Sequence, residues 1–185
     1  AEERSKNFLR NEAKILPKML EKMNLKSPHF VFGHSDGATV ALLYASQQPK
    51  NLQALVAEAP HVFLEAQSVK GIARTKEAYQ KGMLKGLEKY HAPHTDNVVL
   101  SWTNYWLDPA NRDWDMFEEL KKITAPTLFI QGTKDIFGTL QQGEEIRKRT
   151  TGPYKNLILE NCGHAPHFEK QDKVISVTTG FFRKT

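Results

Sequence analysis

The segment HFVFGHSDGATVALLYASQQ, residues 29–48, begins as a short apolar run and continues beyond Gly33 as a helix-like run closed by Pro49. An apolar run that ends in glycine predicts a buried strand, and the run after it predicts a helix. Between them, residues 33–37 match the G-x-S-x-G pattern, which places a serine on a tight strand-to-helix turn. The turn is strained, so we expect both Gly33 and Gly37 to be required as small residues. It would expose the hydroxyl of Ser35 at the carboxyl edge of the sheet and at a helix N-terminus, where backbone amides favour negative charge.

Helix-like and strand-like segments alternate on both sides of this turn. Apolar residues at helical spacing predict a helix over Ser5–Lys22, weakened at Pro17. The pattern also predicts three more buried strands, at residues 51–57, 125–131 and 154–159. It predicts two more helices, at residues 140–149 and 173–182. This alternation is typical of an α/β fold, in which helices flank a mostly parallel sheet.

A long interval without a predicted strand, residues 60–124, separates the second strand from the third. It is rich in Trp, Tyr, His, Lys and Glu and is mostly helical in pattern. Long insertions are usually functional, and ligands of open α/β sheets bind beyond the carboxyl ends of the strands. We therefore interpret 60–124 as a helical cap within a single domain, residues 1–185. The alternative is a peripheral helical layer that contacts no ligand.

Two further residues complete a pattern of nucleophilic catalysis. A serine hydroxyl needs a base to take its proton, and His164 follows the fourth predicted strand in a loop with Gly163 and Pro166. The imidazole needs a carboxylate to fix its tautomer, and Asp135 follows the third strand. The order serine, aspartate, histidine is the one expected of α/β hydrolases. His167 stays open as an alternative base.

Other reactive side chains favour simpler interpretations. His61, His91 and His94 lack the spacing of a metal site, so we predict no metal and no cofactor. Cys162 is interpreted as a small buried residue. Trp106 and the aromatic residues near it either line an acyl pocket or form the core of the cap.

Composition excludes several classes of protein. The chain has 39% hydrophobic and 25% charged residues, which suits a globular domain and not a disordered chain. No apolar run approaches the length of about 18 residues that spans a membrane. The net charge of +5 is spread along the chain, so we expect no nucleic-acid partner. A single cysteine and the absence of an apolar leader in the first ten residues predict a cytoplasmic location.

Four motifs in order give the chain an end-to-end resemblance to the α/β-hydrolase superfamily, in particular to esterase-like bacterial hydrolases. They are the GHSDG turn, APHVF, QG..D..GT and CGH.PH, at residues 33–37, 59–63, 131–139 and 162–167. The resemblance implies an α/β-hydrolase fold with Ser35 as nucleophile, Asp135 as acid and His164 as base. It also implies that the Asp36 amide supports the oxyanion. We expect His34, His61 and Trp106 near the substrate, although His34 could instead be a packing residue.

The chain departs from the superfamily pattern at its N-terminus, where the resemblance implies several more strands and a loop that supplies a second oxyanion amide. We therefore expect a truncated sheet whose first strand, at residues 29–33, is an exposed apolar edge. Such edges pair readily with other chains, so we expect a homodimer that covers it.

The function expected from these residues is hydrolysis of small-molecule carboxylic esters through an acyl-enzyme on Ser35. The alternative is an inactive or weakly active remnant of the fold that serves as a binding or oligomerisation module. Hydrolysis of amide or carbon–carbon bonds uses the same three residues and stays open.

Overall fold

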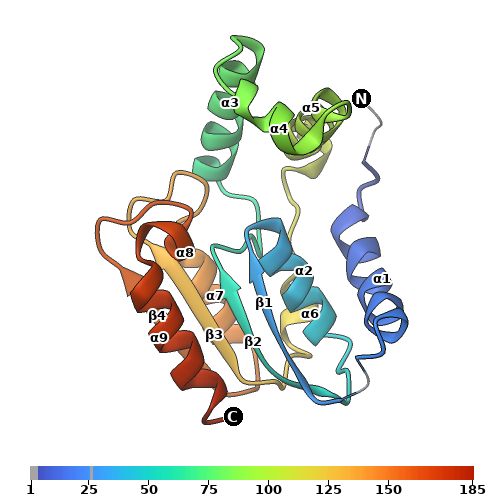
Figure 1. The fold of residues 1–185 in the computed structure, drawn as a ribbon, viewed down its shortest axis with the longest axis vertical. Helices are drawn as coiled ribbons and strands as arrows, with labels where there is room; N and C mark the ends of the chain where they lie inside the picture. The colour runs from blue at the N-terminus through green and yellow to red at the C-terminus, as the bar shows by residue number, and fades with distance from the viewer. Residues whose placement is uncertain (1–3, 26) are drawn as a thin grey trace.

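Four parallel strands form one sheet in the order β1-β2-β3-β4 in the computed structural model, which describes residues 4–25 and 27–185 (Figure 1). The strands are β1 His29–His34, β2 Leu52–Glu58, β3 Thr127–Gly132 and β4 Tyr154–Leu159. The helices are α1 Phe8–Lys22, α2 Asp36–Ala45, α3 Ala66–Gln80, α4 Glu88–His91, α5 Thr95–Leu107, α6 Phe117–Leu120, α7 Gln141–Arg149, α8 Pro166–Glu169 and α9 Gln171–Phe182, with short 3-10 turns η1 Lys85–Leu87 and η2 Pro109–Asn111. This confirms the predicted α/β-hydrolase fold.

Helices cover both faces of the sheet because the side chains of its central strands alternate between two apolar layers. Leu55 and Ala57 of β2 and Phe129 of β3 pack in the layer that contains α1, α2 and α7. The residues beside them along the strands, such as Val56 and Leu128, pack against α9 in the other layer. Cys162 lies fully buried in this second layer, as its interpretation as a small core residue predicts. No helix among the described residues combines the length and apolar character that crossing a bilayer needs.

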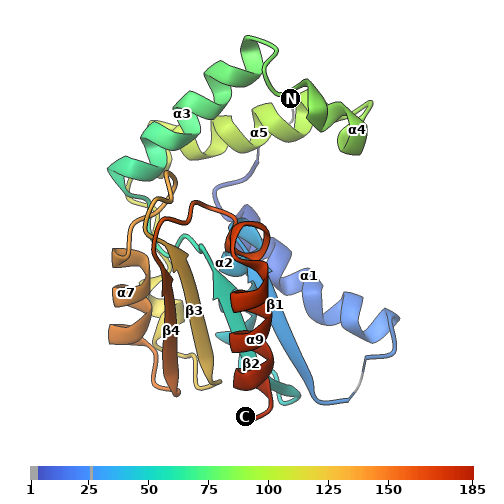
Figure 2. The ribbon, with the colours of Figure 1, turned by 60° about the vertical axis from the view of Figure 1, so that its left-hand side comes forward.

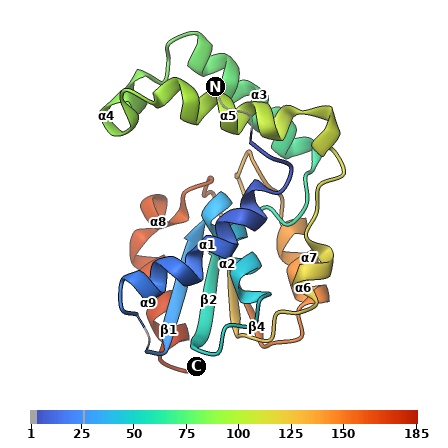
Figure 3. The ribbon, with the colours of Figure 1, turned by 90° about the vertical axis from the view of Figure 1, so that its right-hand side faces the viewer.

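The segment 60–124 is helical, and its helices α3, α4 and α5 stand above the carboxyl ends of the strands (Figure 2 and Figure 3). Its buried aromatic residues belong to the same apolar cluster as α1, α2 and β2, and within that cluster Trp106 packs edge-on against both Tyr105 and Trp114. The hydroxyl of Tyr105 donates a hydrogen bond to the Lys6 carbonyl at 2.9 Å, so this layer is also joined to the chain before α1.

The turn between β1 and α2 is strained at Ser35, whose φ of 56° lies in the left-handed region that residues with a Cβ rarely adopt. Gly33 makes the turn possible, because a Cβ at this position would lie 2.3 Å from the carbonyl oxygen of Gly37. The expectation that Gly37 must also be small is wrong in steric terms. A Cβ added at Gly37 would meet no atom within 4 Å, since it would point away from the sheet at the exposed start of α2.

The β1 strand has a neighbouring strand on one side only among the described residues. Phe30 and Phe32 on this strand are 44% and 42% exposed, although the Phe30 ring also stacks on Phe182. The described sheet therefore has the exposed apolar edge that the sequence predicts, and pairing of this edge with a second chain stays a prediction.

Replacing Gly33 by alanine should lower the free energy of unfolding by about 1–3 kcal/mol, the usual cost of forcing a methyl group into filled space. Gly37→Ala is the matched control. It should leave stability unchanged or raise it by up to about 1 kcal/mol, because alanine is favoured over glycine in helices. Urea denaturation measures both variants. Equal destabilisation by the two substitutions would contradict this description of the turn.

Self-association through β1 predicts that the chain sediments as a dimer and that Phe32→Lys shifts it to the monomer. A charged side chain at this position opposes strand pairing without entering the core, since Phe32 is already half exposed. Sedimentation velocity over a range of concentrations measures this. A wild-type chain that stays monomeric throughout would rule out the dimer.

Candidate active site

The three residues predicted to act together meet at the carboxyl ends of the strands. The Nε2 atom of His164 lies 2.9 Å from the hydroxyl oxygen of Ser35, and its Nδ1 atom lies 2.7 Å from Oδ2 of Asp135. A carboxylate accepts hydrogen bonds, so Nδ1 carries the hydrogen and Nε2 is left to accept the serine proton. The geometry therefore brings a hydroxyl, an imidazole and a carboxylate into one hydrogen-bonded chain, with His164 rather than His167 beside Ser35.

Asp135 is fixed by three donors at the end of β3. Its Oδ2 atom accepts from Gln131 Nε2 at 2.6 Å as well as from His164, and its Oδ1 atom accepts from the backbone N–H of Phe137 at 2.8 Å. The side chain is only 1% exposed. Because its position is determined by both the strand and the following turn, the carboxylate can hold the His164 ring in one orientation.

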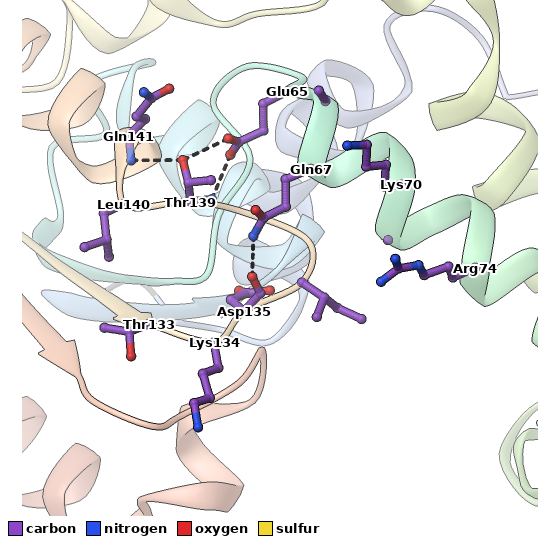
Figure 4. A pocket seen from close by; sticks show the side chains of 13 residues that line it. Glu65, Gln67, Lys70, Arg74, Thr133, Lys134, Asp135, Thr139, Leu140 and Gln141 are labelled. Atoms are coloured by element: carbon purple, nitrogen blue, oxygen red, sulfur yellow. Dashed lines mark hydrogen bonds between the residues drawn. The ribbon is translucent and has the colours of Figure 1, made fainter.

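The segment after β3 also contacts α3. The side-chain amide of Gln67 donates to the Asp135 carbonyl at 2.5 Å, and Glu65 accepts from the Thr139 N–H and hydroxyl (Figure 4). A cavity of about 920 Å³ opens between α3 and this segment, with the basic side chains of Lys70 and Arg74 at its border. Its lining includes Asp135 but neither Ser35 nor His164, so among the described residues the cavity meets the hydrogen-bonded set only at Asp135.

The loop that carries His164 packs directly on the end of β3. Gly132 allows this approach, because a Cβ there would lie 2.3 Å from the carbonyl oxygens of both Cys162 and Gly163. Glu169 of α8 closes the loop by accepting from the Gly163 N–H at 2.8 Å. Glu169 also accepts from the Ala165 N–H at 3.3 Å, so the backbone is held on both sides of His164.

A second histidine–carboxylate pair lies beside the first. Nδ1 of His167 is 2.5 Å from Oε2 of Glu58, a fully buried residue at the end of β2. The His34 ring packs against the rings of both His164 and His167, with centroids 4.9 and 4.7 Å away. Nε2 of His34 donates to the His164 carbonyl at 2.8 Å, so His34 supports the backbone of the candidate base.

Burial governs the electrostatics around this cluster. It raises the pKa of Glu58, although the hydrogen bond from His167 acts in the opposite direction. Burial likewise lowers the pKa of His34 despite the bond to the His164 carbonyl. Burial also raises the pKa of Asp36 and lowers that of His61, and the attraction between these two groups opposes both shifts.

The remaining predicted residues surround the turn in different ways. Asp36 is the first residue of α2, so its backbone N–H lies at the helix N-terminus directly after Ser35. His61 is only 2% exposed; its Nε2 atom donates to the Phe137 carbonyl at 3.1 Å, and its backbone exchanges two hydrogen bonds with Thr39. Trp106 is fully buried against the His61 ring. Both side chains therefore support the packing behind the turn and do not present an open surface to a ligand.

Three residues of the site escape sequence reasoning: Glu58, Gln131 and Gln67. Glu58 and Gln131 are polar residues at the end of apolar strands, which is a usable signal because functional side chains gather at that edge of a parallel sheet. Gln67 has no such signal, since its role depends on how α3 docks on the segment after β3.

Comparison with known proteins finds a family match over the first part of the chain. Residues 4–102 match the family described as serine aminopeptidase, S33, and the matched part includes the Ser35 turn but stops before Asp135. A proline iminopeptidase of Saccharolobus solfataricus is 37% identical over 70 residues, which is 38% of this chain and 22% of that protein. A pimeloyl-[acyl-carrier protein] methyl ester esterase of Neisseria meningitidis is 26% identical over 167 residues, 77% of this chain and 53% of that protein.

The matched part of this chain thus spans only about a fifth to a half of the length of these curated relatives. Among solved structures, a serine hydrolase involved in carbazole degradation aligns with a TM-score of 0.76 at 17% identity, covering 100% of this chain and 75% of that one. This likeness shows the fold. Since the family match covers more than half of the 185 residues, the chain belongs to the serine aminopeptidase family of α/β hydrolases.

Proposed function

We propose that this chain is a serine hydrolase that cleaves small-molecule carboxylic esters through an acyl-enzyme on Ser35. The observation that carries the proposal is the continuous hydrogen-bonded chain from Ser35 through His164 to Asp135, with distances of 2.9 and 2.7 Å. Both distances are those of good hydrogen bonds, so the proton can pass without rearrangement of the side chains.

In the first half of the reaction, the Ser35 oxygen attacks the ester carbonyl while its proton passes to Nε2 of His164. Asp135 stabilises the imidazolium that forms and keeps its ring in place. The negative charge on the former carbonyl oxygen is stabilised by the Asp36 N–H at the start of α2. The intermediate then collapses, the carbon–oxygen bond to the alcohol breaks, and His164 returns the proton to the departing alkoxide.

In the second half, water replaces the alcohol. His164 takes a proton from the water as the resulting hydroxide attacks the acyl carbonyl, and it returns that proton to the Ser35 oxygen when the acyl bond breaks. The products are a carboxylic acid, an alcohol and the free enzyme. Because every proton and electron pair is accounted for by these residues, the proposed reaction needs no cofactor.

The surroundings of His164 favour an acyl group of apolar character. The Phe137 ring lies against the His164 ring with centroids 4.6 Å apart, and Trp102 of α5 meets Phe137 edge-on at 6.3 Å. Phe137 lies beside His164 and Trp102 lies in the helical segment above it, where both rings can contact the carbon chain of a substrate. The relative named as a methyl ester esterase supports the ester as the bond that is cleaved.

Amide hydrolysis is the second candidate, and the family match favours it, since the family is described as serine aminopeptidase. The residues would be the same, because both reactions pass through an acyl-enzyme. An amine is a poorer leaving group than an alcohol, so the second candidate relies more heavily on protonation by His164.

Labelling by a fluorophosphonate, which reacts with activated serines, should require Ser35 and His164. Ser35→Ala should abolish labelling, and His164→Ala should slow it by about 10³-fold or more, because the base is lost. The exposed Ser5 and His94 provide the matched controls Ser5→Ala and His94→Ala, which should label at the wild-type rate. In-gel fluorescence against time measures each rate.

Absence of labelling in the folded wild-type chain would contradict the proposal and favour the alternative of a binding or oligomerisation module. Labelling that survives Ser35→Ala would place the reactive hydroxyl elsewhere.

If the chain is an ester hydrolase, its kcat/KM should be larger for p-nitrophenyl acetate than for L-proline p-nitroanilide. Both activities should be lost in Ser35→Ala. The two substrates release chromophores that are followed by absorbance. A higher kcat/KM on the anilide would show that the substrate is an amide rather than an ester, while the proposed role of Ser35 as nucleophile would stand.

A further inference from the structure

The cluster formed by His34, Glu58 and His167 has the composition of a metal site. One nitrogen from each ring and one carboxylate oxygen lie within 4.8 Å of one another. Two imidazoles and one carboxylate form a donor set that suits Zn²⁺ and related transition metals. The proposed hydrolysis uses none of these three side chains as nucleophile, acid or base.

Two of the three side chains have a free ligand atom. His34 uses Nε2 to donate to the His164 carbonyl, which fixes its tautomer and leaves the Nδ1 lone pair free. Metal-binding histidines usually donate their second N–H to a carbonyl or carboxylate in this way. In Glu58, Oε2 accepts from His167 while Oε1 is buried and has no hydrogen-bond partner among the described residues.

The cluster can also be reached and closed around an ion. The side chain of His167 is 30% exposed, so it provides a path from solvent, whereas Glu58 is fully buried behind it. Zinc binds nitrogen and carboxylate oxygen at about 2.0–2.2 Å. The donors therefore need to move together by roughly an ångström, and the proton between Glu58 and His167 must leave, as deprotonation accompanies metal binding in general.

We propose that His34, Glu58 and His167 bind a divalent transition-metal ion, with Zn²⁺ as the best fit, and that the bound ion inhibits the neighbouring Ser35. The inhibition rests on the proposed function, but the binding does not. The His34 ring lies 4.9 Å from the His164 ring, so the ion is adjacent to the base. Its double positive charge opposes the charge that His164 acquires when it takes the serine proton.

Calorimetric titration of the metal-free full chain with ZnCl₂ tests binding directly and needs no catalytic activity. We expect one zinc per chain, and Glu58→Gln should weaken the affinity at least about tenfold, because the amide keeps the shape but loses the negative charge. His34→Gln provides a second variant with a more exposed side chain. His94→Ala, at an exposed cap histidine, is the matched control and should bind as the wild type does.

Failure of the wild type to bind one zinc would overturn the site, as would a zinc affinity in both Glu58→Gln and His34→Gln equal to that of the wild type. Loss of zinc in His164→Ala with retention in Glu58→Gln would place the ion on His164 and Asp135 and overturn the assignment.

Fluorophosphonate labelling in the presence and absence of saturating zinc tests the inhibition. Zinc should slow labelling of the wild type at least about tenfold, and a chelator should restore it. The Glu58→Gln variant should lose this sensitivity. Bound zinc with unchanged labelling would contradict the inhibition. Failure of the proposed function is distinguishable, because labelling would then be absent without zinc while the calorimetric result stands.

Discussion

The hydrogen bond between Asp135 Oδ2 and His164 Nδ1 is the interaction on which the candidate site depends. It joins two segments that leave neighbouring strands, β3 and β4, and it determines which nitrogen of the imidazole faces Ser35. Without this bond the ring could adopt the other tautomer, and the serine would have a donor beside it in place of an acceptor. The parallel arrangement of the strands makes the contact possible, because it brings the loops after all four strands to one edge.

The surrounding structure fixes the two partners of that bond independently. Asp135 is oriented by Gln131 and by the Phe137 N–H, whereas His164 is carried on a loop that packs on Gly132. The backbone of His164 is further supported by His34, which belongs to the same strand that leads into the Ser35 turn. A short path of contacts thus connects the nucleophile's strand to the base, so that their relative position follows from the packing of the sheet.

The second pair, Glu58 and His167, gives the site a buried carboxylate that the reaction does not require. Desolvation of a carboxylate is costly unless a partner compensates, and one oxygen of Glu58 has no hydrogen-bond partner in the described structure. A residue of this kind at the functional edge of a sheet suggests a role beyond packing, and this observation is the physical basis for the proposed metal site.

Sequence reasoning located the parts of the site that are encoded locally. The strand, turn and helix around Ser35 are adjacent in the chain, and the strand at 154–159 has the predicted boundaries. The docking of Gln67 and the pairing of Glu58 with His167 could not be predicted, since each depends on how distant segments pack. The error at Gly37 has a similar origin: whether a Cβ fits there depends on the direction in which α2 leaves the turn.

The geometry of the site requires that His164 activates Ser35 and no other hydroxyl for acyl transfer. Incubation with p-nitrophenyl acetate, rapid acid quenching and mass spectrometry of the digested protein test it most directly. If His164 is the base, the peptide that contains Ser35 carries an acetyl group in the wild type and none when His164 is replaced by alanine. An unmodified Ser35 peptide, or acetylation that persists without His164, would contradict it.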